Sequence, residues 1–189
     1  MHFRGFTLLS VFTIFLVTLF SSLPQAYGAG NSVDRSFKPS SPFSQALETL
    51  QKQIGFTFKS IGLLRRAMTH ASFSEENNKA LSILGSHVIE TSVSLRSLEK
   101  DIDLSSKELN KLILEISNVE SSCAVDGARL GLHKVIRVSP KTDPSSPTIV
   151  CLAFRAVLGA IAVDSGNTDE AVKIFWSIHN DKVGRAVSV

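Results

Sequence analysis

The stretch that decides the fold is PTIVCLAFRAVLGAIAVD, residues 147–164. Between Thr148 and Val163 its one charged residue is Arg155, so a helix here is apolar on every side. Pro147 suits the first helical position, where its missing N–H would have no partner. A helix over 148–163 rises only about 24 Å. It is shorter than the roughly 20 residues that a membrane-spanning helix requires. With Arg155 at mid-span, the stretch predicts the central helix of a core and not a membrane helix.

Helical patterns also flank this stretch. Apolar residues at helical spacing, or capping residues at the ends, predict helices over residues 44–54, 61–70, 76–98, 105–116, 119–130 and 167–178. Ser105 and Glu108 form a capping box, and Gly55 and Gly131 are stop signals. Strand patterns of period two are absent from the sequence. The predicted fold class is all-α.

Composition excludes several kinds of protein. The chain has 189 residues, with 20 Lys+Arg against 17 Asp+Glu and a formal net charge of +3. A charge this small does not indicate nucleic-acid binding by bulk electrostatics. Two cysteines exclude a disulfide-rich miniprotein and a multi-cysteine zinc module. No glycine-rich phosphate loop is present, which excludes P-loop and dinucleotide-binding folds.

The N-terminus has the pattern of a targeting segment. Arg4 precedes an uncharged apolar run over 6–20, and Ala26 and Gly28 are small residues two apart, as signal peptidase requires. We expect a signal peptide over 1–28, a Ser/Pro-rich leader over 29–43, a domain over 44–180 and a C-terminal tail over 181–189. The expected location is the secretory pathway or endoplasmic reticulum lumen, with no membrane contact in the mature form. A retained membrane anchor and an organellar transit peptide are the alternatives.

Four motifs resemble the ribonuclease III family, in the order and at the spacing of that family. LLRRAMTHASF at 63–73 resembles its "LLxxAxTHxS(Y/F)" segment, and NNKALSILGS at 77–86 resembles its signature "NERLEFLGD". ARLGL at 128–132 and FRAVLGAIAVD at 154–164 resemble "ARxLGL" and "FEALIGAIYLD". The resemblance implies an all-helical endonuclease domain that usually forms homodimers. The sequence is most similar to a small plant member of the family. This resemblance implies a role in nuclear fusion (karyogamy).

The resemblance breaks at the residues that carry the family's chemistry. The family cleaves duplex RNA with two Mg²⁺ ions, which need carboxylate oxygens. Its metal-site positions fall here on Ser82, Ser86, Leu152 and Arg155, and its adjacent acidic position falls on Lys79. Replacing four carboxylates by three neutral residues and one cation changes the local charge by +5. The sequence therefore predicts a pseudoenzyme with no catalytic residue, no metal site and no cofactor.

Two further groups of residues are candidates for structural or binding roles. Arg155 needs a partner on its apolar helix, and it forms either an ion pair with Glu90 or, with Lys79, a cationic pocket for phosphate. Cys123 and Cys151 fall at positions that are buried and apolar in the family. They are interpreted as buried thiols, with a disulfide as the alternative because the sequence does not give their separation.

The preferred function is a ribonuclease III-like domain that acts by binding or assembly, as a homodimer or with an unidentified protein partner. The alternative is a ribonuclease of this class in RNA processing. The family's double-stranded-RNA-binding domain does not follow the last helix, so RNA binding is expected to be weak or absent.

The mature chain is predicted to begin near Ala29. N-terminal sequencing of the protein from its native cell measures this directly. Recovery of Met1 at the N-terminus would contradict cleavage and leave the anchor interpretation.

Overall fold

The computed structural model describes residues 41–186, with side chains described through residue 180. Helices are the regular elements of this part of the chain, and one isolated bridge pairs Thr69 with Arg137. The all-α prediction is confirmed. The expected signal peptide and nearly all of the expected leader lie outside the described residues.

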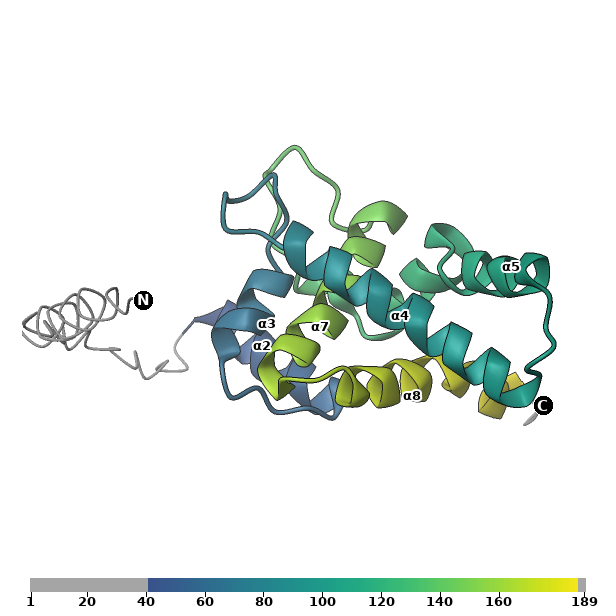
Figure 1. Ribbon diagram of the computed structural model, residues 1–189. Helices are drawn as coiled ribbons and strands as arrows, with labels where there is room; N and C mark the ends of the chain where they lie inside the picture. Colours follow the sequence, from purple (N-terminus) through teal and green to yellow (C-terminus); the bar gives the residue numbers. More distant parts are fainter. Residues whose placement is uncertain (1–40, 187–189) are drawn as a thin grey trace, which may run out of the picture. The chain divides into compact units, whose positions relative to one another are not determined.

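The helices follow one another in a fixed order (Figure 1). They are α2 (Pro42–Ile54), α3 (Ile61–Ala67), α4 (Lys79–Lys100), α5 (Ser106–Ile116), the π-helical turn η1 (Val119–Cys123), α6 (Ala124–Arg129), the 3-10 turn η2 (Leu132–Lys134), α7 (Pro147–Ser165) and α8 (Asp169–Ala186). The predicted capping box of α5 is confirmed, since Ser105 Oγ accepts from Glu108 N and the Glu108 side chain accepts from the Ser105 backbone.

Several helix boundaries differ from those predicted. Ser41 caps α2 in place of Ser44, because Pro42 occupies the first helical position and the Ser41 hydroxyl accepts from Ser44 N. The second helix ends at Ala67, since the chain beyond it pairs with another segment: Arg137 N donates to Met68 O.

Two other helices also differ from the prediction. The single helix expected over 119–130 is two elements, η1 and α6. Helix α8 continues to Ala186, into the expected tail.

Helix α7 is the core of the described fold. Twelve of its residues are buried, with Phe154, Val157, Leu158 and Ile161 among the largest fully enclosed side chains. Residues Pro147–Ser165 are long and apolar enough to cross a membrane by length and composition, and 67% of that window is buried within the fold. Helices α3, α4, α6 and α8 all contact α7, as its apolar character on every side predicts.

Helices α4 and α7 cross with their backbones in direct contact. A Cβ atom added to Gly85 would lie 1.8 Å from Arg155 O, and one added to Gly159 would lie 2.1 Å from Leu81 O. Side chains larger than hydrogen cannot fit at either position. Consequently the two glycines allow the closest helix pair in the fold to form.

We predict that Gly159→Ala lowers the free energy of unfolding by about 3 kcal/mol and the melting temperature by on the order of 10 °C, because the helices must separate. Thermal unfolding followed by circular dichroism measures the effect. Gly62→Ala on α3 is the matched control, since its nearest neighbour would be Ser60 Oγ at 3.7 Å. Equal melting temperatures for the two variants would contradict the role given to the crossing.

Candidate functional site

The four positions that the sequence analysis matched to the family's metal ligands lie on α4 and α7, the two helices that cross. Ser82 and Ser86 lie on either side of Gly85 on α4, and Leu152 and Arg155 lie one turn apart on α7. The Arg155 backbone packs against Gly85 itself. The fold thus brings together the residues that the sequence singled out.

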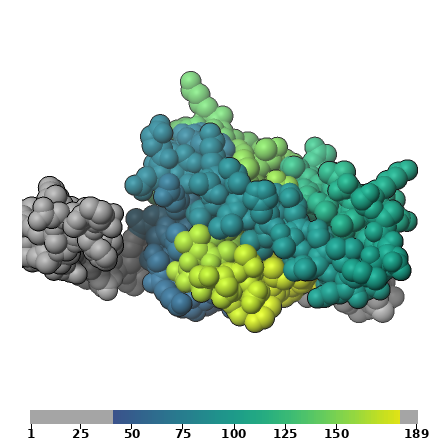
Figure 2. Space-filling view, in the orientation of Figure 1, coloured from purple at the N-terminus to yellow at the C-terminus, as the bar shows by residue number. Residues whose placement is uncertain are grey.

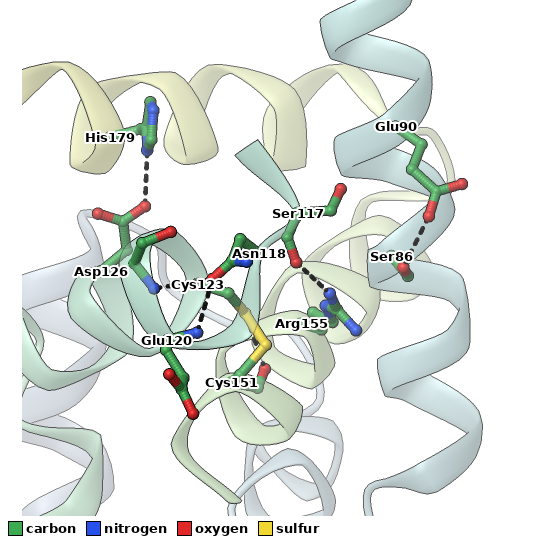
Figure 3. The surroundings of a disulfide bond; sticks show 11 residues. Ser86, Glu90, Ser117, Asn118, Glu120, Cys123, Asp126, Cys151, Arg155 and His179 are labelled. Carbon is green, nitrogen blue, oxygen red and sulfur yellow. Dashed lines mark hydrogen bonds and ion pairs between the residues drawn. A yellow bond between two sulfur atoms is a disulfide. The ribbon is translucent and has the colours of Figure 1, made fainter. Parts of the chain in front are cut away.

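The hydroxyl groups of Ser82 and Ser86 both donate hydrogen bonds to groups of their own helix. Ser82 is buried, and its Oγ donates to Lys79 O at 3.1 Å within the first turn of α4. The Oγ of Ser86 donates to Glu90 Oε1 at 3.1 Å, one turn further along the same helix (Figure 3). Both hydroxyls therefore make bonds within α4.

Arg155 is half-buried and bonds to a backbone carbonyl. Its Nη2 donates to Ser117 O at 2.8 Å, which ties α7 to the residue that ends α5 (Figure 3). Burial lowers the pKa of Arg155, and the negative charge of Glu90 acts in the opposite direction. Glu90 is therefore close enough to influence Arg155 electrostatically.

The two alternatives that the sequence offered for Arg155 need correction. Arg155 and Glu90 do not form an ion pair within 4.0 Å; Glu90 bonds to Ser86 and lies 3.8 Å from His87 Nδ1. Lys79 is exposed at the start of α4. The pKa of His70 is lowered mainly by burial and secondarily by the positive charge of Lys79. The hydrogen bond that Arg155 makes goes to a backbone carbonyl group, which every residue has, so the sequence does not reveal it.

The crossing offers few of the groups that a divalent cation prefers as ligands. Hard cations require several oxygen ligands, mostly carboxylates. Glu90 supplies the one carboxylate whose charge acts on Arg155, and the guanidinium there repels Mg²⁺. Among the described residues, no group of three or more His, Cys, Asp or Glu side chains is placed to hold a metal ion.

Cys123 and Cys151 are joined by a disulfide. Their Cα atoms lie 5.0 Å apart, and both residues are buried. The bond links η1 to α7 one turn before Arg155 (Figure 3). The interpretation as two separate thiols does not hold in this structure, because the fold places the two positions within bonding distance.

A buried carboxylate was missed by the sequence analysis. Asp126 on α6 is fully buried, and its Oδ2 lies 2.7 Å from His179 Nδ1 on α8. Arg129 Nη1 lies 3.6 Å from Asp126 Oδ1 and donates to Ile178 O at 2.7 Å. This cluster holds α8 against α6. The one signal of this cluster in the sequence is that Asp126 is an acid on an otherwise apolar helix face. Its partner His179 is 53 residues away in the sequence.

Known proteins resemble this chain over the described domain. The family model described as Ribonuclease-III-like matches residues 60–181. Protein NUCLEAR FUSION DEFECTIVE 2 of Arabidopsis thaliana is 58% identical over 183 residues, covering 96% of this chain and 95% of that protein. Ribonuclease 3 of Thiobacillus denitrificans is 32% identical over 129 residues, covering 66% of this chain. The alignment spans only 56% of that bacterial relative.

A solved structure shows the same arrangement of helices. The nuclease domain of ribonuclease III from Campylobacter jejuni matches with a TM-score of 0.67 and 28% sequence identity. The match covers 71% of this chain and 96% of that one. That structure is described as flexible in a region involved in dimer formation.

We predict that removing the disulfide, by Cys123→Ala with Cys151→Ala, lowers the free energy of unfolding by about 3–4 kcal/mol. The bond closes a loop of 28 residues in the unfolded chain. Thermal unfolding with and without reductant measures the loss, and reductant should not affect the double variant. Two thiols that alkylate after denaturation without reductant would show that the bond is absent in solution.

Proposed function

Because this chain belongs to the ribonuclease III-like family, we propose that it is a non-cleaving member that acts by binding or assembly in nuclear fusion. The observation that carries the proposal is the crossing of α4 and α7. Ser82, Ser86, Leu152 and Arg155 occupy it in place of the family's four carboxylates, and Glu90 is bonded to Ser86.

Electrostatics support the loss of two-metal hydrolysis. A two-metal site stabilises the attacking and leaving oxygens of the phosphoryl group, and it needs concentrated negative charge to hold its ions. Arg155 adds a positive charge beside the crossing, on a guanidinium that bonds to Ser117 O at the end of α5. Glu90 alone does not offset both that guanidinium and the charge of two Mg²⁺ ions.

The nuclear-fusion role rests on similarity to one relative. The Arabidopsis protein, which is 58% identical over almost its whole length, has a name that refers to nuclear fusion. We also infer that this chain is located in the secretory pathway or the endoplasmic reticulum lumen. The apolar segment over 6–20 and the Cys123–Cys151 disulfide support that location, since disulfides persist in oxidising compartments.

Assembly as a homodimer is the second part of the proposal. The Campylobacter nuclease domain is described as dimer-forming. In this chain α4 and α8 run side by side at the surface (Figure 2), and Ile83 and Leu95 on α4 are more than half exposed. We infer that these two side chains take part in the contact between the two copies of the chain. Sedimentation equilibrium of the purified protein distinguishes a dimer from a monomer.

We predict that the purified protein leaves labelled duplex RNA uncut in Mg²⁺ or Mn²⁺ and shows no saturable Mg²⁺ binding by calorimetry. An active bacterial ribonuclease III is the positive control. A variant that carries Ser82→Glu, Ser86→Asp, Leu152→Asp and Arg155→Glu should gain Mg²⁺ binding if the crossing has kept the family's geometry.

Metal-dependent cleavage at constant specific activity through successive purification steps would refute the proposal. That outcome would assign the chain to the ribonucleases of this class in RNA processing. Saturable Mg²⁺ binding by the unmodified chain would contradict the electrostatic argument even without cleavage.

A further inference from the structure

We propose that a small pocket beside α3 binds a phosphomonoester group. Three arginines, Arg65, Arg66 and Arg137, are among the residues that line a cavity of about 220 Å³. Arg65 and Arg66 come from α3, and Arg137 comes from the segment after η2 that pairs with Thr69. The pocket shares no lining residue with the α4–α7 crossing, and the proposed function does not use it.

The charge of the pocket matches a dianion. Among its lining residues the three arginines face one acid, Glu76, which leaves a formal charge of +2. A phosphomonoester carries about −1.5 to −2 charges at pH 7. Burial, and secondarily the charge of Arg65, lower the pKa of Arg137, so cations repel one another here. A bound dianion would relieve that repulsion.

Two of the three arginines make contacts that hold them before any ligand arrives. The Arg137 guanidinium lies 4.4 Å from the ring centroid of Phe43 and 4.8 Å from that of Phe73, and its Nη2 donates to Thr69 Oγ1. Arg66 Nε donates to Asn77 O at 3.2 Å. Side chains fixed in this way lose little entropy when they bind a ligand.

The size and lining of the cavity select the phosphate group itself. A volume of about 220 Å³ is smaller than the roughly 300–1,000 Å³ of pockets that enclose drug-sized molecules. The rings of Phe43 and Phe73 already face Arg137, so they are not stacking platforms for a base. Guanidinium groups bind phosphate oxygens through paired N–H donors. A terminal phosphomonoester, with three oxygens and two charges, uses these groups better than a phosphodiester does.

The test is a titration of the isotope-labelled full chain with glycerol 3-phosphate, followed by amide and arginine Nε–H chemical shifts at constant ionic strength. Saturable shifts should be confined to residues 60–69 and 137. Dimethyl phosphate, a monoanionic diester, should bind at least tenfold more weakly. Lowering the pH from 7.5 to 5.5 should weaken the monoester, because its second pKa is about 6.

Arg66→Gln should raise the Kd for glycerol 3-phosphate at least fivefold. Lys111→Gln is the matched control, since it removes the same charge from an exposed side chain on α5, 3.8 Å from Glu115. An equal change in Kd for the two variants would overturn the proposal, because binding would then follow net charge alone. Shifts that stay linear with ligand concentration, or equal affinities for monoester and diester, would overturn it as well.

Discussion

The contact between the backbones of α4 and α7 is the constraint on which the rest of the structure depends. Gly85 lies against Arg155 O, and Gly159 lies against Leu81 O, so neither helix can rotate or withdraw without losing the other's surface. The core side chains of α7 then fill the space that the remaining helices enclose. Because the two backbones touch here, the residues beside the crossing on both helices have little freedom to shift.

The contacts beside this crossing differ from those of a two-metal site. Carboxylates around metal ions would attract α4 and α7 through the ions. Here the guanidinium of Arg155 donates a hydrogen bond to Ser117 O, which links α7 to the end of α5. The disulfide from Cys151 to Cys123 ties the same neighbouring segment one turn earlier. Two independent links therefore attach the α5–η1 segment to the central helix, one turn apart on α7.

Much of the fold could be predicted because its signals are local. The apolar character of 147–164, the capping box at Ser105 and the family motifs each lie within a few residues of sequence. The contacts that the sequence did not reveal are long-range: Asp126 with His179, and Arg155 with Ser117. The second of these uses a carbonyl group, which every residue has. Charge patterning instead favoured Glu90, whose carboxylate bonds to its own helix.

The burial of the disulfide affects how the protein reaches and keeps its native state. Cys123 and Cys151 are at most 2% exposed to solvent. Oxidants and thiolates therefore cannot reach the sulfur atoms once the core has closed. Thiol–disulfide exchange requires direct attack on sulfur. The bond must therefore form while the chain is still open. Once the native state is reached, a later change in the surrounding redox conditions leaves the bond intact until the domain opens.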